Sequence, residues 1–159
     1  VFSIYGKDEL SFTSNQVGIG FMLCGLVMAV LQPFFATYGE RFITSKQQIA
    51  LGLLLTSLSL IAFPFLNSEL YVYVMIVIFA IGGALVTPNL LSAVSLISKE
   101  NTGRNISIQS STNSIGQILG PILGVWLISG GFYYPFIIAG LIVLVSIVFV
   151  IPLIKWQRQ

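Results

Sequence analysis

The most regularly spaced polar side chains of this chain lie between Ser107 and Gly124, which reads SIQSSTNSIGQILGPILG. Gln109, Asn113 and Gln117 are four residues apart, so on a helix they share one face. Carboxamides donate and accept hydrogen bonds without carrying a charge. This face is therefore a candidate lining for a substrate cavity or a water-filled path, and the alternative is hydrogen bonding to neighbouring helices.

The glycines of the same stretch have the same spacing. Gly116, Gly120 and Gly124 are four residues apart, and Pro121 follows the middle one. Glycines on one helix face let another backbone approach closely, so we expect this half of the helix to pack against a neighbour. Pro121 predicts a bend, which is either a hinge or a passive kink. A helix that combines a polar face with a packing face is expected in a transport core rather than in a simple anchor.

The composition excludes several functional classes. The chain is 56% hydrophobic and 8% charged, with a mean hydropathy of +0.97, whereas soluble domains average about 25% charged residues. Its net charge of +2 forms no basic patch, so no nucleic-acid partner is expected. With no histidine and only Cys24, no metal or cofactor site and no disulfide framework are predicted. Only serine chemistry remains for an enzyme, and no G-x-S-x-G is present, so the chain is not expected to be an enzyme.

The elements that must position these residues are membrane spans. Five stretches of about 20 mostly apolar residues predict an all-α integral membrane protein with five transmembrane helices. The predicted spans are 15–35, 48–66, 70–91, 105–128 and 134–154, preceded by an external segment, 1–14. None contains Asp, Glu, Lys or Arg, each of which would cost about 2.5 to 3.5 kcal/mol at a helix centre.

The boundaries and the orientation follow from local signals. Thr13 and Gln16 have capping-box spacing, Asn105 is placed to cap the fourth span, and Gln32–Pro33 suggests the exit of the first. Basic residues occur on alternate connections: Arg41 and Lys46, then Lys99 and Arg104, then Lys155 and Arg158. Because basic residues mark the cytoplasmic side, we expect a multi-pass protein of the plasma membrane that starts outside and ends inside. The chain starts at Val1 rather than Met, and no positively charged leader precedes an apolar core. Both features suggest a fragment of a longer protein.

Two motifs carry a resemblance to a known family. The segment Gln32 to Lys46 reads QPFFATYGERFITSK. It is similar to a signature loop of the form G-x-L-A-D-R-x-G-R-R at Ala36, Tyr38, Gly39, Glu40 and Arg41. Asn113 to Gly124, NSIGQILGPILG, resembles a G-P-x-x-G helix. Together they resemble the C-terminal half of a major facilitator superfamily transporter, in the drug:proton antiporter branch of bacterial multidrug and tetracycline exporters. The departures are Ala36 for the first glycine, Glu40 for the aspartate and Ile43 for the second glycine.

The resemblance implies an architecture and its partners. The five spans would be helices eight to twelve, after the outer end of helix seven at Phe2–Tyr5 and an external loop at Gly6–Ser14. The missing N-terminal half and the rest of helix seven would complete two six-helix halves that rock around a midplane cavity. The implied partners are the lipid bilayer, a small amphipathic substrate and protons.

The resemblance also implies roles for charged residues. Ala36, Gly39, Glu40 and Arg41 would form a cytoplasmic gating loop, with Glu100 and Arg104 as possible partners in a charge relay. The alternative for Glu40 and Arg41 is a solvated loop end. Asn89, directly after Pro88, either borders the cavity or caps freed backbone.

The expected function is export of amphipathic drugs or similar small organic molecules. No titratable side chain lies inside a predicted span, so the acids that couple transport to protons would lie in the missing part. Two alternatives stay open at this point. One is a sugar or metabolite carrier of the same superfamily, and the other is a non-transporting membrane assembly subunit.

Overall fold

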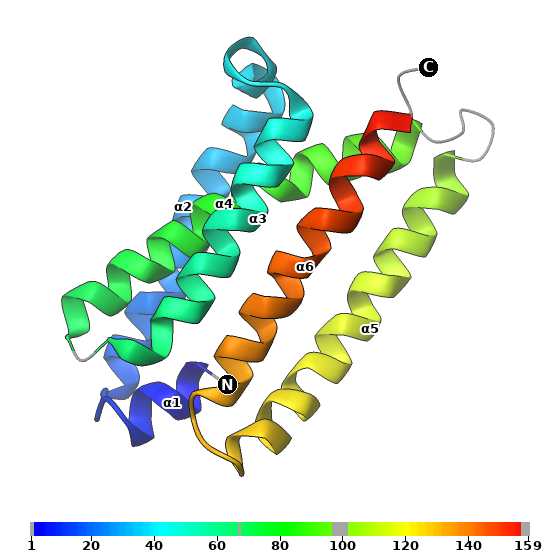
Figure 1. Ribbon diagram of the computed structural model, residues 1–159. Coiled ribbons are helices and arrows are strands. Elements are labelled where there is room, and N and C mark those ends of the chain that lie inside the picture. Colours follow the sequence, from blue (N-terminus) through cyan, green and yellow to red (C-terminus); the bar gives the residue numbers. More distant parts are fainter. Residues whose placement is uncertain (1, 67, 97–101, 157–159) are drawn as a thin grey trace.

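The computed structural model describes residues 2–66, 68–96 and 102–156, and every regular element in these ranges is a helix (Figure 1). In chain order the elements are α1 (Phe2–Asp8), α2 (Ser14–Phe42), α3 (Ser45–Ala62), the short 3₁₀ helix η1 (Phe63–Phe65), α4 (Glu69–Leu96), α5 (Thr102–Ile128) and α6 (Tyr134–Trp156).

The predicted spans fall on α2 to α6 in order, and the second span also covers η1 after the end of α3. Three helical stretches in the described residues are long and apolar enough to cross a bilayer: Ser14–Phe42, Ser45–Phe65 and Glu69–Ser95. The apolar stretch of α6 that can be assessed, Tyr134–Val150, is shorter, and α5 has the length but is more polar. The all-α membrane architecture is confirmed, while the number of five spans stays a prediction.

The helix α2 is longer than predicted. It continues through Pro33 and ends at Phe42, so the predicted exit at Gln32–Pro33 is wrong. A proline inside a helix removes one backbone donor, a loss that a long membrane helix tolerates when neighbouring groups satisfy the freed carbonyl. The helix closes where the Ile43 N–H donates to the Gly39 carbonyl at 3.1 Å. Only Ile43 and Thr44 separate α2 from α3, so most of the predicted loop is helical.

Helix starts follow side-chain caps in two cases and depart from the expected cap in a third. The predicted capping box at α2 is confirmed, because the Thr13 N–H donates to Gln16 Oε1 at 2.8 Å and the Gln16 N–H donates to Thr13 Oγ1 at 3.4 Å. At the start of α3 the Thr44 N–H likewise donates to Gln47 Oε1, at 3.0 Å. The helix α5 begins at Thr102, so the expectation that Asn105 caps it is wrong, and Asn105 lies inside the first turns.

The helix α4 is the centre of the packing. It packs along both α2 and α3, and α6 packs along α3, whereas α5 makes much less extensive contacts with α4 and α6 (Figure 1). The backbones of α3 and α4 approach each other closely at Gly52 and Gly82, where a Cβ built at Gly52 would lie 2.7 Å from the Gly82 carbonyl oxygen. Neither helix could carry a larger residue here without moving apart.

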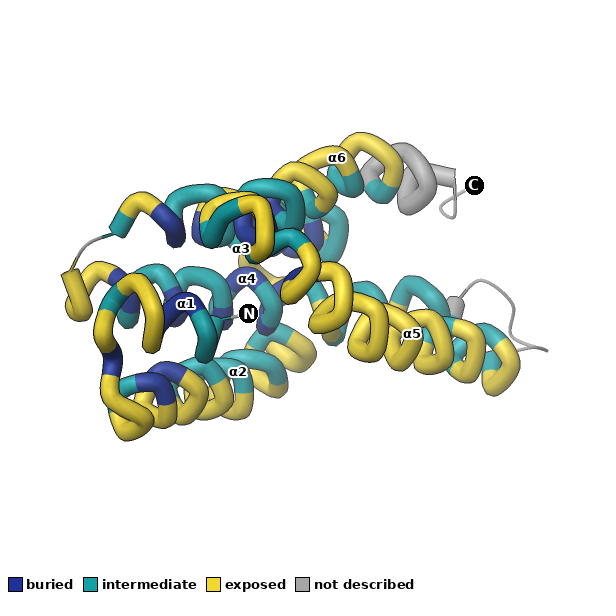
Figure 2. Tube along the Cα trace, turned by 90° about the horizontal axis from the view of Figure 1, so that it is seen from below, coloured by how far each residue is buried: buried dark blue, intermediate teal, exposed yellow. Residues whose placement is uncertain are grey.

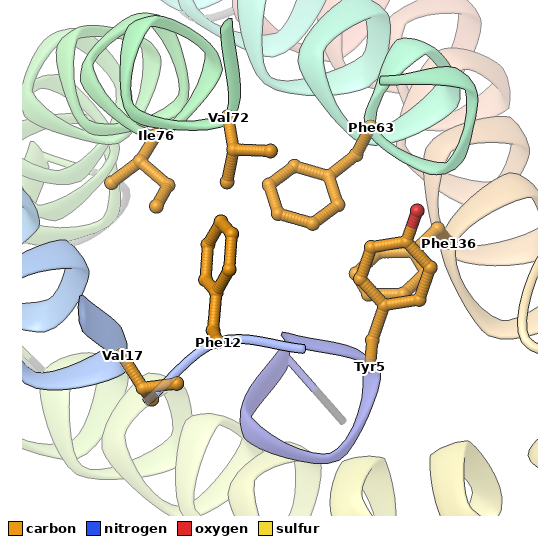
Figure 3. Close-up of a cluster of buried hydrophobic side chains, with 7 residues drawn as sticks. All are labelled: Tyr5, Phe12, Val17, Phe63, Val72, Ile76 and Phe136. Atoms are coloured by element: carbon orange, nitrogen blue, oxygen red, sulfur yellow. The ribbon is translucent and has the colours of Figure 1, made fainter. Parts of the chain in front are cut away.

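An aromatic cluster closes the end of the bundle at which α1 lies. The hydroxyl of Tyr5 donates to the Pro64 carbonyl at 3.3 Å, and the rings of Phe63 and Phe136 stack with centroids 5.0 Å apart. Figure 3 shows side chains from separate segments converging there: Tyr5, Phe12, Val17, Phe63, Val72, Ile76 and Phe136. The helix α1 runs to Asp8, three residues beyond the predicted end of helix seven, because its Tyr5 and Gly6 are buried in this contact.

Large apolar side chains remain on the outside of the bundle. Figure 2 shows exposed residues along α2 and over most of α5. On α6, Val148 and Phe149 are also well exposed. A soluble monomer rarely exposes apolar surface on this scale, whereas the hydrocarbon of a bilayer covers it without cost.

Candidate functional site

A groove of about 820 Å³ separates α4 from α5, and it contains two of the predicted site residues, Gln109 and Asn113. Its α4 wall is mostly apolar, and its α5 wall carries the polar side chains. The lining residues are Val86, Thr87, Leu90, Leu91 and Val94 on α4, and Asn105, Ile106, Ile108, Gln109, Ser110, Thr112, Asn113 and Gly116 on α5. An apolar wall facing a polar wall suits a molecule that has one side of each kind.

Two side-chain atoms at this groove are buried without a hydrogen-bond partner in the part of the chain that the structure describes. They are the donor Asn105 Nδ2 and the acceptor Gln109 Oε1, one helical turn apart on α5. A buried polar atom without a partner costs about 1 to 3 kcal/mol, so each has a strong preference for a ligand, a water molecule or another helix. The groove lining therefore contains one donor and one acceptor, both buried, that have no partner among the described residues.

Three hydroxyls of α5 are not free in the same way. Ser107, Thr112 and Ser114 each donate to a carbonyl four residues earlier on their own helix, at 2.8, 2.9 and 3.0 Å. These bonds satisfy the hydroxyl protons locally. Of these three residues only Thr112 lines the groove, so α5 presents its carboxamides and the Ser110 hydroxyl there for recognition.

The remaining predicted residues of α5 lie beyond the groove or at its edge. Gln117 is exposed and is not part of the lining. Gly116 lines the groove, Gly120 and Pro121 are exposed, and Gly124 is buried. No described atom lies within 4 Å of a Cβ built at Gly116 or Gly120, so the expected close helix contact is not made within the described residues.

Asn89 does not join the groove, although it lies on α4. Its side chain is only 7% exposed, and Nδ2 donates to Gln48 Oε1 at 2.9 Å and to the Leu85 carbonyl at 2.8 Å. Of the two roles expected for Asn89, its placement fits contact with backbone and with a neighbouring helix and does not fit a border of the groove. Sequence reasoning missed Gln48, and its position at the polar start of an apolar span was the available signal.

The predicted gating residues lie on the last turns of α2. Gly39 is buried, whereas Ala36, Glu40 and Arg41 are exposed. Glu40 accepts a hydrogen bond from the Ser45 hydroxyl, and the Arg41 guanidinium lies over the Tyr38 ring, 5.3 Å from its centroid.

The expected charge relay is not formed between described residues. Glu40 and Arg41 make no ion pair within the described part of the chain, and neither does Arg104, which is exposed on the first turn of α5. Glu100 lies outside the described residues. In residues 2–66, 68–96 and 102–156, no group of three or more His, Cys, Asp or Glu is placed to hold a metal ion.

A helical bundle with apolar outer faces and a groove lined on one side by carboxamides defines a multi-pass membrane protein. The chain belongs to the Major Facilitator Superfamily, whose family model matches residues 1–158.

Curated relatives share this family at low identity. Multidrug resistance protein 2 of Bacillus subtilis (strain 168) is 23% identical over 147 residues, which cover 92% of this chain and 37% of the relative. Multidrug resistance protein MdtH of Klebsiella pneumoniae (strain 342) is 26% identical over 133 residues, or 83% of this chain and 33% of the relative. The chain thus spans about a third of the length of the curated relatives it matches. No solved structure matches it significantly.

Proposed function

We propose that this chain forms part of a secondary active transporter that exports amphipathic organic compounds across the plasma membrane. The observation that carries the proposal is the groove between α4 and α5, whose α4 wall is mostly apolar and whose α5 wall presents carboxamides. The printed names of the relatives describe multidrug resistance proteins, which agrees with a substrate of this kind.

The chemistry of the groove favours weakly polar substrates. Its lining residues include no Asp, Glu, Lys or Arg, so no fixed charge selects an ionic headgroup. The apolar wall contributes by excluding water from a substrate's hydrocarbon part. The free Asn105 donor and Gln109 acceptor orient a polar end through hydrogen bonds rather than through ion pairing.

Proton coupling places a further requirement on the intact protein. An antiporter needs a titratable group that the membrane encloses, and all five Asp and Glu residues of this chain lie outside the predicted spans. In the proposed function the coupling acids therefore belong to the rest of the transporter. The proposal also includes the expected orientation, with the start of the chain outside and its end in the cytoplasm.

The test is efflux by the full-length protein in a bacterial host that lacks its own drug pumps. Accumulation of a fluorescent amphipathic dye should fall on expression and recover when an ionophore collapses the proton gradient. Gln109→Leu should change the relative efflux of polar and apolar dyes, whereas Gly25→Leu, at an exposed position of α2 with open space around it, is the matched control. Dye accumulation that is the same with and without the protein would refute the function.

A further inference from the structure

Two buried carboxamides join three helices on the side of α4 that faces away from the groove. Gln48, in the first turns of α3, is fully buried. Its Nε2 donates to the Ile43 carbonyl at 3.1 Å, directly after the end of α2, and its Oε1 accepts from Asn89 of α4 at 2.9 Å. We call Gln48 and Asn89 the amide pair. It bonds the two-residue turn between α2 and α3 to α4.

Gly39 makes room for the amide pair. A Cβ built at Gly39 would lie 2.5 Å from Gln48 Oε1, 2.8 Å from Nε2 and 2.9 Å from Cδ. The Gln48 carboxamide thus rests directly on the backbone of α2. This contact gives Gly39 a role separate from the charges beside it, because any side chain at position 39 would displace Gln48 from both of its partners.

The amide pair lies at the level of the groove. Val86, Leu90 and Leu91 line the groove within one turn of Asn89, which is buried on another face of the same helix. One face of this part of α4 therefore lines the groove. Another face of it is bonded to the connection between α2 and α3. The adjacent Pro88 lacks a backbone donor, so the helix has one hydrogen bond fewer at this level and depends more on the side-chain bond.

We propose that Gln48 is a positioning residue for transport: through Asn89 it holds the groove wall of α4 to the α2–α3 turn, so that the two move as one body between transport states. The proposal rests on the proposed function. Gln48 and Asn89 do not line the groove, so they act on the movement of its wall and leave substrate contacts intact. Losing the bond uncouples the turn from the wall.

The first test measures efflux kinetics of the full-length protein, normalised to the amount in the membrane. Gln48→Met keeps the length and packing of the side chain and removes its polar atoms. Gln48→Met and Asn89→Leu should each lower the maximal efflux rate about fivefold and leave KM unchanged. A change of this size is typical of coupling between sites. The double variant should be no worse than either single one, because both remove the same bond.

Ser57→Ala is the matched control. The Ser57 hydroxyl is also fully buried and also bonds between helices, to the Gly140 carbonyl of α6 at 2.9 Å, but far from the turn. The maximal efflux rate of Ser57→Ala should stay near that of the wild type. Equal rate losses in Gln48→Met and Ser57→Ala, additive losses in the double variant, or a change in KM alone would each overturn the proposal.

The second test needs no transport. Spin labels at Lys46→Cys, beside the turn, and Ser92→Cys, one turn beyond Asn89, are placed in cysteine-free full-length protein, and their separation is measured in acidic and alkaline buffer. One narrow distance distribution in both buffers, broadened by Gln48→Met, supports the proposal. A distribution that Gln48→Met leaves unchanged overturns it. If the wild type shows no efflux, the proposed function fails, and these distances still test the amide pair.

Discussion

The contact between Gly52 and Gly82 predicts that a single methyl group destabilises the bundle. A Cβ at Gly52 would lie 2.7 Å from the Gly82 carbonyl oxygen, 2.7 Å from Val86 Cγ2 and 2.9 Å from Leu85 Cβ. Real Cβ atoms are essentially never found below 3.0 Å from such neighbours. A carbonyl in the middle of a helix cannot rotate away, so Gly52→Ala must push α3 and α4 apart.

The expected change in the free energy of unfolding is the difference between an overpacking cost and a gain in helix propensity. Overpacking of a well-packed contact costs about 1 to 3 kcal/mol. Replacing glycine by alanine in a helix returns about 0.5 to 1 kcal/mol, because the unfolded chain loses conformational freedom. We therefore expect Gly52→Ala to lower the free energy of unfolding by about 1 kcal/mol, and by no more than about 2.5 kcal/mol. At Gly25 of α2 nothing lies within 4 Å of a Cβ, so Gly25→Ala should leave stability unchanged or raise it by up to about 1 kcal/mol.

The assay is unfolding of the purified full-length protein by SDS titration in mixed micelles. Wild type, Gly52→Ala and Gly25→Ala are compared at the same lipid-to-detergent ratio. The reasoning is refuted if Gly52→Ala is as stable as Gly25→Ala, because the α3 and α4 backbones would then not approach at this point. A loss of stability in both variants would also refute it, since the exposed control has no contact to lose.

Three further predictions concern α5. Asn113 is exposed and lines the groove, so Asn113→Leu should change the range of exported dyes more than the amount of protein in the membrane. If an immunoblot shows that expression collapses, Asn113 instead bonds to another helix. Gln109→Leu removes an acceptor that has no partner, so SDS titration should show stability unchanged or raised by about 1 kcal/mol. Gly120→Leu meets open space within the described residues, so a loss of efflux at unchanged expression would locate its partner outside this chain, and unchanged efflux would count against any close contact there.

The helices could be predicted because membrane insertion imposes a strong pattern. Long apolar runs without charge have few alternatives to a helix, and the predicted spans fall on α2 to α6 in order. The ends of the helices are harder to predict, because local sequence signals for the end of a helix compete with signals for its continuation. Pro33 is typical of a helix exit, but the residues after it continue α2 to Phe42, where the Ile43 N–H bond to Gly39 closes it.

The close helix contact could not be found from spacing within one helix. Gly116 and Gly120 have the expected four-residue spacing, yet nothing in the described chain approaches them. Gly52 and Gly82 have no such spacing, because they lie on different helices and neither helix has a second glycine four residues away. A close approach is a property of two surfaces, and one sequence pattern shows only one of them.

The same limit applies to the polar residues of the candidate site. Gln109, Asn113 and Asn89 are all carboxamides inside predicted spans, and composition alone treats them alike. Asn89 differs because Gln48 on another helix supplies its acceptor at 2.9 Å, whereas the Gln109 acceptor has no partner among the described residues. A paired carboxamide in a membrane fixes the arrangement of helices, and an unpaired one is available to a ligand or to a further helix. The groove therefore has one wall that is held from behind by the amide pair and another whose polar atoms are still free.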